Sequence, residues 1–311
     1  MSRRWPITFV TFDQLPMLDP DDRLVATELE RRGVACGISV WDQENINWSE
    51  AGLCVVRSTW DYHLKYELFQ KWITKVSNLT AIENSAALLR WNSDKRYLLD
   101  LERKGVPIIP TTWFEQGESV DLDCVLEMNG YRQAVIKPTI GLSTYGVKSV
   151  TFGNFSDKET LNDLLRKNAV MMQPFIGSVN SYGERGLVYI NGQYAHTIRK
   201  MPFQHAAVAG EAGEQAVHAT DEERRFALSV LSTLSETPLY ARVDIVKDDQ
   251  GEYRLMELEL METSLYMSLQ PQSISIFADA IMQRIEASGI RTLPYEKIVP
   301  SSKVRSEEKN D

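Results

Sequence analysis

The sequence has 311 residues, about two domain lengths, and 43% of them are hydrophobic, as in an ordinary globular protein. The 43 Asp and Glu residues outnumber the 34 Lys and Arg residues, so the formal net charge is −9 at pH 7. This balance disfavours general binding to nucleic acid or anionic lipid. Apolar runs are far shorter than the ~20 residues of a membrane-spanning helix. We therefore expect a cytoplasmic protein with no nucleic-acid or membrane partner.

The first 85 residues alternate short β-branched or aromatic runs with amphipathic helical patterns. Strands are predicted over 7–12, 34–40, 53–57 and 80–82, and helices over 21–32 and 63–76. This order is that of a βαβ unit. The polar residues 83–85 mark the first domain boundary, so the N-terminal unit is predicted to span residues 1–85.

Residues 86–175 have the pattern of an α+β module. Asn92, Ser93 and Asp94 can cap a helix that runs through Lys104 and ends at Gly105. The other predicted elements are strands over 106–111, 132–138, 145–152 and 169–175, and helices over 121–129 and 157–167.

Residues 176–295 are predicted to form a third unit. Asn191-Gly192 is a strong hairpin signal between strands over 186–190 and 193–199. Residues 200–218 are rich in Gly and Ala, without a clear period, and are predicted to be a mobile loop. A helix over 221–235, strands over 239–246 and 252–260, and a helix over 273–287 follow. The charged residues 296–311 are predicted to be a disordered tail.

Several common catalytic motifs are absent from the sequence. We find no G-x-x-x-x-G-K-[ST], G-x-G-x-x-G, H-E-x-x-H or G-x-S-x-G pattern, and the four histidines lack ligand-like spacing. What remains is a set of charged residues within or at the ends of predicted strands, where a solvated charge is least expected.

Lys137 is the first of these charged residues. It ends the apolar strand Ala134-Val135-Ile136 and precedes a turn rich in glycine and hydroxyl groups, from Gly141 to Gly146. Backbone N–H groups of such a turn, next to a lysine, suit a phosphate chain. The alternative is a strand-end lysine before an ordinary turn.

Two C-terminal strands carry the second group. Alternation places Arg242 and Asp244 on one face of their strand, and Glu257 and Glu259 on one face of the next. Three carboxylates that converge would repel unless hard cations lay among them, and oxygen ligands suit Mg²⁺ bound to substrate phosphates. The alternative is an exposed sheet face with salt bridges.

The segment Arg57-Ser58-Thr59-Trp60-Asp61-Tyr62 is predicted to contact substrate. It follows a predicted strand, and ligands of open α/β sheets bind beyond the carboxyl ends of the strands. Its mixture of charges, hydroxyls and aromatic rings suits a zwitterionic, amino-acid-like ligand. In the alternative, Asp61 starts the following helix and Trp60 fills a gap between domains.

The charged residues, taken in chain order, resemble the ATP-grasp superfamily of carboxylate ligases, typified by glutathione synthetase and D-alanine–D-alanine ligase. The resemblance runs from about residue 85 to residue 288. It rests on Asn84-Ser85, Lys95, 135–138, 141–146, 171–176, Gly183-Glu184, Arg199-Lys200, 242–244 and 257–259. Residues 57–62 and 257–265 look most like the group that contains the O-ureido-D-serine cyclo-ligase of cycloserine biosynthesis.

The resemblance implies an α/β (α+β) ATP-grasp fold, with a Rossmann-like N-terminal domain and two α+β subdomains, 86–175 and 176–295, that clasp the nucleotide. It also implies ATP and two Mg²⁺ ions, which Mn²⁺ can replace. The implied nucleotide-binding residues are Lys95, Lys137, Gly141, Ser143, Thr144, Gln173, Phe175, Ile176 and Glu184. The implied metal ligands are Asp244, Glu257 and Glu259.

Arg242 and one of Arg199 and Lys200 would face transferred phosphate or substrate carboxylate, and Ser264 would lie on the substrate side. The sequence does not choose between Arg199 and Lys200. The implied chemistry is phosphoryl transfer to a small amino-acid-like substrate and attack by nitrogen, as in antibiotic biosynthesis. An intermolecular ligase and a non-catalytic ATP-binding module remain alternatives, and a homo-oligomer is possible.

Overall fold

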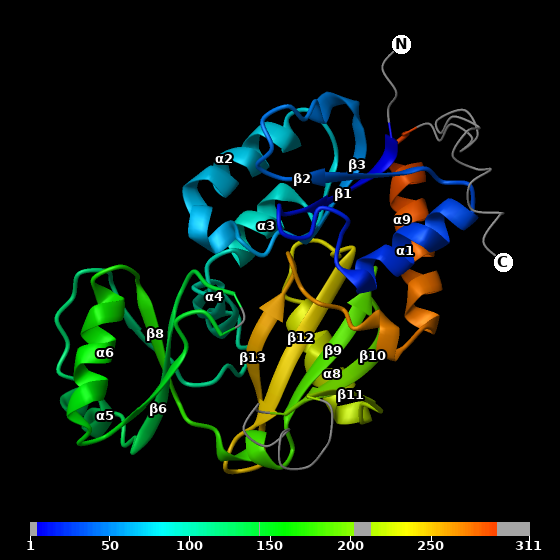
Figure 1. The fold of residues 1–311 in the computed structure, drawn as a ribbon. Helices are drawn as coiled ribbons and strands as arrows, with labels where there is room; N and C mark the ends of the chain where they lie inside the picture. The colour runs from blue at the N-terminus through cyan, green and yellow to red at the C-terminus, as the bar shows by residue number, and fades with distance from the viewer. Residues whose placement is uncertain (1–4, 143, 202–212, 291–311) are drawn as a thin grey trace.

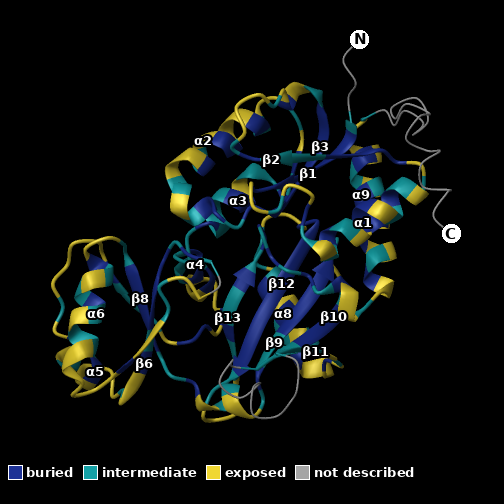
Figure 2. Cartoon of the chain, viewed as in Figure 1, coloured by how far each residue is buried: buried dark blue, intermediate teal, exposed yellow. Residues whose placement is uncertain are grey.

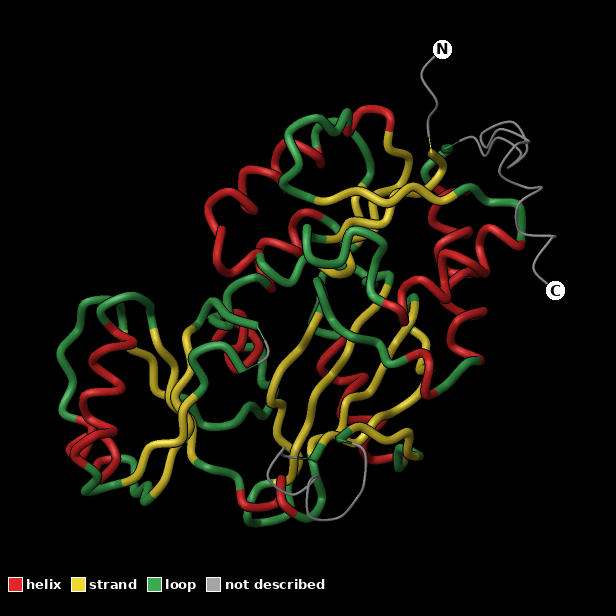
Figure 3. Tube along the Cα trace, in the orientation of Figure 1, coloured by secondary structure: helices red, strands yellow, loops and turns green. Residues whose placement is uncertain are grey.

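The computed structural model describes residues 5–142, 144–201 and 213–290, which form three β-sheets flanked by helices (Figures 1 and 3). The strands are β1 (Trp5–Thr11), β2 (Cys36–Val40), β3 (Ala51–Ser58), β4 (Ile82–Glu83), β5 (Thr112–Phe114), β6 (Gln133–Pro138), β7 (Lys148–Thr151), β8 (Val170–Pro174), β9 (Glu184–Ile190), β10 (Gln193–Lys200), β11 (Glu214–Val217), β12 (Tyr240–Lys247) and β13 (Tyr253–Glu259).

The α-helices of the described residues are α1 (Pro20–Arg31), α2 (Tyr66–Ser77), α3 (Ala86–Asn92), α4 (Tyr97–Arg103), α5 (Leu122–Met128), α6 (Phe155–Leu165), α8 (Asp221–Leu231) and α9 (Gln272–Ala287). Short 3₁₀ turns are η1 (Trp48–Glu50), η2 (Tyr62–Lys65), η3 (Gly177–Asn180) and η4 (Met267–Leu269). No described helix is both long and apolar enough to cross a bilayer.

The N-terminal sheet is parallel, with strand order β2-β1-β3-β4. Alternating residues of its central strands enter two different cores. Phe9 and Val55 pack with residues of α1 and α9, whereas Val10 and Val56 pack with residues of α2 and α3. The predicted βαβ beginning therefore matches the observed arrangement.

The central sheet is antiparallel, with order β5-β8-β6-β7, and it has a core of its own. Helices α5 and α6 cover one face, where Leu126 and Leu161 pack against Ile136 and Met172. Figure 2 shows the outer surfaces of these two helices largely exposed.

The C-terminal sheet is antiparallel, with order β11-β10-β9-β12-β13. Alternation again separates two faces. Tyr189 and Val243 pack with α4 and α8, whereas Ile190 and Tyr240 pack with α9 and with the N-terminal sheet. Helix α9 thus belongs to a single apolar core shared by the first and last sheets (Figure 1).

Asn84 joins the N-terminal unit to the C-terminal sheet. Its side chain is fully buried; its amide nitrogen donates to the carbonyl oxygens of Tyr240 (2.9 Å) and Leu260 (2.6 Å), and its oxygen accepts from the Leu239 N–H (2.6 Å). Buried backbone groups at the ends of β12 and β13 are thereby paired, as their burial requires.

The predicted start of the helix from 92 to 104 is wrong, whereas its C-terminal part is present as α4. The chain forms α3 and α4, separated by a turn over residues 93–96, and the carboxylate of Asp94 accepts from the Arg96 N–H at 2.9 Å. The Lys95 N–H donates to the Thr139 carbonyl at 2.8 Å instead of to a helical partner. A tertiary contact to the central module therefore interrupts the helix.

The strand predicted over 106–111 is also wrong. Only Ile108 makes a bridge there, with Leu255, and the regular strand β5 begins at Thr112. Pro107 and Pro110 have no N–H to donate to a ladder.

The predicted loop over 200–218 contains a strand. Residues Glu214–Val217 form β11, which pairs antiparallel with β10 from Thr197 to Lys200. Residues 202–212 and the whole predicted tail, residues 296–311, lie outside the described residues. The mobility predicted for the loop therefore stays a prediction.

Candidate active site

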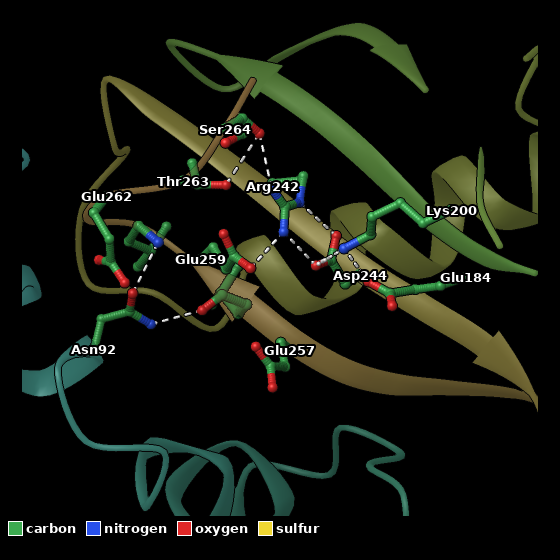
Figure 4. Close-up of polar contacts among 12 residues, drawn as sticks. Asn92, Glu184, Lys200, Arg242, Asp244, Glu257, Glu259, Glu262, Thr263 and Ser264 are labelled. Atoms are coloured by element: carbon green, nitrogen blue, oxygen red, sulfur yellow. Dashed lines mark hydrogen bonds and ion pairs between the residues drawn. The ribbon is translucent and has the colours of Figure 1, made fainter. Parts of the chain in front are cut away.

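One face of the C-terminal sheet gathers the charged residues identified from the sequence. Arg242 lies opposite Glu259, and Asp244 opposite Glu257, in the register of β12 and β13. On the other side, Lys200 of β10 lies opposite Glu184 of β9. The predicted alternation on the two C-terminal strands is therefore what the sheet shows (Figure 4).

Arg242 is the centre of this polar face. Its Nε and Nη2 donate to the two oxygens of Asp244, each at 2.8 Å, in a bidentate pair. Nη2 also donates to Glu259, and Nη1 donates to the Ser264 carbonyl at 2.8 Å. Burial raises the pKa of Asp244, but the charges of Arg242 and Lys200 outweigh burial and hold that pKa below its usual value. Asp244 is therefore ionised at neutral pH.

Gly186 of β9 leaves room for the Arg242–Asp244 pair. A Cβ atom at Gly186 would lie 3.0 Å from the Asp244 Oδ1 atom and 3.1 Å from the Arg242 Cδ atom. These distances are too short to accommodate without a shift. This residue was not predicted from the sequence, because only the cross-strand register reveals what lies beside it.

The structure separates Arg199 from Lys200. Lys200 Nζ pairs with Glu184 and lies 3.0 Å from Asp244 Oδ2, whereas Arg199 contacts Ser181 and Met201. The geometry favours Lys200 as the cation of the site.

Glu184, the residue predicted to hold the ribose, is paired with Lys200. Burial raises the pKa of Glu184 to about 7, with the Asp244 charge acting in the same direction and Lys200 opposing it. Its ribose role stays a prediction.

Lys137 and Glu257 connect the central and C-terminal sheets. Lys137 Nζ donates to Glu257 Oε1 at 2.6 Å, and Lys95 Nζ lies 3.7 Å from Glu257 Oε2. Burial raises the pKa of Glu257, but the two lysines outweigh it and lower that pKa to about 2. Lys95 also donates to the Gly141 carbonyl at 3.0 Å, so both predicted phosphate-binding lysines lie next to the glycine-containing turn.

The predicted metal ligands fit Mg²⁺ by their chemistry. Asp244, Glu257 and Glu259 are carboxylates on adjacent strands, and hard cations prefer such oxygens. However, each is paired with a cationic side chain. Within residues 5–142, 144–201 and 213–290, no three His, Cys, Asp or Glu side chains form a group that could hold a metal ion. The carboxylates do converge as expected, but in the structure their positive partners are lysine and arginine side chains.

The predicted adenine segment lies where the chain passes from the central sheet to the C-terminal sheet. Gln173 Nε2 donates to Thr111 Oγ1 at 3.0 Å, and the Phe175 N–H donates to the Gln133 carbonyl at 3.1 Å. Ile176 packs in a small apolar cluster with Ile109, Val246, Val179 and Met256. This junction is compatible with the predicted adenine contact, which stays a prediction.

The turn from Gly141 to Gly146 is described except for Ser143, which lies outside the described residues. Gly141 is buried and Thr144 is exposed. The ring of Tyr145 lies 4.7 Å from that of His63, measured between ring centroids, so the turn contacts the N-terminal unit.

The predicted substrate segment begins with a buried arginine. Arg57 is 2% exposed; its Nε donates to Asp22 Oδ1 (2.8 Å) and its Nη2 to the Thr263 carbonyl (2.8 Å). Its Nη1 atom and the Oγ1 atom of the fully buried Thr59 have no hydrogen-bond partner among the described residues. Buried polar atoms without a hydrogen bond destabilise the fold unless a ligand supplies that hydrogen bond.

The rest of the segment is held by internal contacts. Asp61 accepts from Trp41 Nε1 at 2.7 Å and from Lys65 Nζ at 2.8 Å, and it precedes η2. Trp60 Nε1 donates to the Glu262 carbonyl at 2.9 Å, and Tyr62 is buried in the N-terminal core. These contacts favour the structural alternative, in which Asp61 starts the following helical turn and Trp60 fills a gap between domains. Ser264 contributes its carbonyl oxygen to Arg242.

Two further residues near the site were not predicted from the sequence. Asn92 donates to the Leu258 carbonyl (2.7 Å) and accepts from the Leu260 N–H (2.8 Å), which pairs the free edge of β13 (Figure 4). Glu262 lies just beyond β13, near Glu259. Neither residue belongs to a spacing pattern from which the sequence could have identified it as part of the site.

Comparisons with known proteins point to one group. Residues 7–84 match the family model for the N-terminal domain of D-cycloserine synthetase DcsG. The cycloserine biosynthesis protein DcsG of Streptomyces lavendulae is 29% identical over 269 residues, which cover 82% of this chain and 90% of the relative. The crystal structure of D-cycloserine synthetase DcsG superposes with a TM-score of 0.81 and 26% identity, over 90% of this chain and 99% of that chain.

More distant structures share the fold. PsnB, an ATP-grasp ligase solved with its minimal precursor, Mg and ADP, gives a TM-score of 0.61 at 16% identity, over 91% of this chain and 99% of that chain. D-alanine–D-alanine ligase from Bacillus anthracis gives 0.61 at 14% identity, over 97% and 99% of the two chains.

The parallel N-terminal sheet and the two antiparallel sheets form the ATP-grasp fold. The similarity to DcsG over most of both chains identifies an ATP-grasp ligase that forms carbon–nitrogen bonds. The fold class predicted from the sequence is confirmed. Within that class, the chain is related to D-cycloserine synthetase DcsG, the O-ureido-D-serine cyclo-ligase.

Proposed function

We propose that the protein activates the carboxylate of O-ureido-D-serine with ATP and closes the molecule into a ring. Similarity to DcsG over most of both chains supports this substrate. The observation that carries the proposed chemistry is the Lys137–Glu257 pair, which joins the central and C-terminal sheets beside Lys95. Lysines held between two sheets can bind the phosphates of ATP, and the carboxylates beside them can bind the metal ions that accompany those phosphates.

The proposed reaction has two steps. An oxygen of the substrate carboxylate attacks the γ-phosphorus of ATP, the bond to the β–γ bridging oxygen breaks, and ADP leaves an acyl phosphate behind. The ureido nitrogen that carries the ether oxygen then attacks the acyl carbon, phosphate leaves with the bonding electrons, and the nitrogen loses its proton. No protein nucleophile is needed, so the work of the chain is positioning and charge neutralisation.

Lys95 and Lys137 are assigned to the phosphates. In the structure both are paired with Glu257, and phosphate oxygens would replace that carboxylate as their partner. Lys200 and Arg242, held by Asp244, are assigned to the transferred phosphoryl group or the substrate carboxylate. Charge-assisted hydrogen bonds of this kind strengthen as negative charge develops.

Asp244, Glu257 and Glu259 are assigned to Mg²⁺ or Mn²⁺, as two ions. Such a cation, when bound, neutralises charge on the phosphate oxygens. We assign residues 1–85 to the substrate unit and residues 86–175 and 176–295 to the two subdomains that clasp the nucleotide. A cytoplasmic location and a role in antibiotic biosynthesis belong to the same proposal.

The test is incubation of the purified protein with ATP, Mg²⁺ and O-ureido-D-serine, with ADP measured enzymatically and the organic product by mass spectrometry. Formation of ADP together with a cyclic product supports the proposal. ADP with a linear product that joins two amino acids would instead show an intermolecular ligase. Nucleotide binding without ADP formation on any pooled amino acid would indicate a non-catalytic module. Glu252→Gln, a change at an exposed residue outside the site, is the control variant.

A further inference from the structure

Five carboxylate side chains lie on or beside the polar face of the C-terminal sheet, and four of them have a cationic partner. Glu184 pairs with Lys200, Asp244 and Glu259 pair with Arg242, and Glu257 pairs with Lys137. Glu262 is the fifth. No other side chain in the described parts of the chain donates to its carboxylate or forms an ion pair with it.

Glu262 faces several groups from neighbouring elements. In Figure 4 it lies beyond Glu259, on the far side from Lys200. Burial raises its pKa to about 8; the charges of Glu259 and Glu257 act in the same direction and Lys95 opposes them. The Glu262 charge in turn raises the pKa values of the buried Tyr62 and Tyr240, whose burial is the larger cause. The carboxylate is therefore half-buried among negative charges and hydroxyl groups. Lys95 acts on it from a distance, but its ion pair is with Glu257, so Glu262 has no cation of its own.

A second observation places an incomplete polar site nearby. The loop that carries Glu262 is joined to the predicted substrate segment, since Trp60 donates to the Glu262 carbonyl and Arg57 to the Thr263 carbonyl. In that segment, Arg57 Nη1 and Thr59 Oγ1 are buried without partners among the described residues. Around one loop, therefore, the Arg57 Nη1 atom and the Thr59 hydroxyl group lack hydrogen-bond partners, and the Glu262 carboxylate lacks a side-chain partner.

We propose that Glu262 accepts the ammonium group of the amino-acid substrate, that Thr59 Oγ1 lies beside it in the same subsite, and that Arg57 Nη1 donates to an oxygen atom of the same substrate. An ammonium group supplies the positive charge that Glu262 lacks, and three N–H donors for its oxygens. The subsite orients the substrate so that its own carboxylate reaches the lysines and arginine of the polar face. This inference rests on the proposed function and deepens it, because it requires a substrate with a free amino group.

The experiment measures binding and turnover separately. The probes are O-ureido-D-serine and its des-amino analogue, 3-(ureidooxy)propanoic acid, which keeps every group except the ammonium. Their dissociation constants are measured by calorimetry in the presence of Mg²⁺ and a non-hydrolysable ATP analogue, and ADP formation is measured with ATP. The proteins are wild type, Glu262→Gln, Glu262→Asp, Glu259→Gln and Glu252→Gln.

Wild type should bind the amino compound on the order of 10- to 100-fold more tightly than the des-amino analogue, the range expected for a charged hydrogen bond. Glu262→Gln should lose most of this preference by weakening only the amino compound. Glu262→Asp keeps the charge and should retain part of the preference. Glu259→Gln should lower turnover while preserving the preference, and Glu252→Gln should behave as wild type.

Two outcomes would overturn the assignment of Glu262. One is equal binding of both compounds by wild type; the other is an undiminished preference in Glu262→Gln with an unchanged affinity for the ATP analogue. A thermal melt of each variant establishes that it is folded. If Glu262→Gln is not folded, Glu262→Asp is compared with wild type instead.

Binding without ring closure in wild type would refute the proposed reaction while leaving the subsite supported by the selectivity. If wild type binds neither compound, both the proposed substrate and the ammonium subsite are wrong.

Discussion

Replacement of Glu262 by Gln should stabilise the protein more at high pH than at low pH. The pKa of this group is raised from 4.5 to about 8, mainly by burial and then by the Glu259 charge. In the native state Glu262 stays neutral while in the unfolded chain it ionises, so the stability it contributes is fully present below about pH 4.5 and is lost as the pH rises to about 8. One pKa unit corresponds to about 1.4 kcal/mol, so the full loss is on the order of 4 to 5 kcal/mol.

The assay is urea unfolding of wild type and Glu262→Gln at pH values from 5 to 8, without ligands. The free energy of unfolding of the variant minus that of wild type should grow by about 1.4 kcal/mol per pH unit over most of this range. Other titrating groups, such as Glu184, are common to both proteins and cancel in the difference. Glu252→Gln, at an exposed position, should show no such trend. A difference for Glu262→Gln that is independent of pH would refute the reasoning.

Three other predictions follow from the polar face and from its support. Glu257→Gln should abolish ADP formation while the variant stays folded by circular dichroism, because it removes both a proposed metal ligand and the partner of Lys137; near-normal turnover at saturating Mg²⁺ would contradict the assignment. Lys137→Ala should raise the dissociation constant of a non-hydrolysable ATP analogue on the order of tenfold or more, as expected for loss of a charged hydrogen bond, and calorimetry showing an unchanged constant would argue against phosphate contact. Asn84→Ala should lower the free energy of unfolding by about 2 to 4 kcal/mol, because it leaves the Leu239 N–H and two buried carbonyls unpaired; a loss below about 0.5 kcal/mol in urea unfolding, the lower end for one hydrogen bond, would mean that these groups find other partners.

Local periodicity is enough to predict much of the polar face. Side chains two apart on a strand share a face, so the sequence alone groups Arg242 with Asp244, and Glu257 with Glu259. The Asn191-Gly192 turn likewise predicts the hairpin between β9 and β10, where both residues adopt positive φ angles.

Contacts between distant segments are beyond local patterns. The Lys137–Glu257 pair joins residues of two different sheets, and the turn between α3 and α4 depends on the hydrogen bond from Lys95 to Thr139. Glu262 stands out only because its neighbours are paired and it is not. Arg57 was expected at the surface of a binding site, yet it is buried, with its guanidinium 4.4 Å from the Tyr240 ring centroid.

The shared apolar core described above also constrains how the chain is assembled during synthesis. Phe9 and Val55 of the N-terminal sheet pack against Phe277 and Ile281 of α9, and residues 84–271 lie between β4 and α9. At 5 to 20 residues per second, a ribosome needs roughly 10 to 40 s to add this intervening chain. For that interval, one apolar face of the first sheet is covered by α1 but lacks α9. The nascent N-terminal unit therefore offers chaperones an exposed surface until the last described helix emerges.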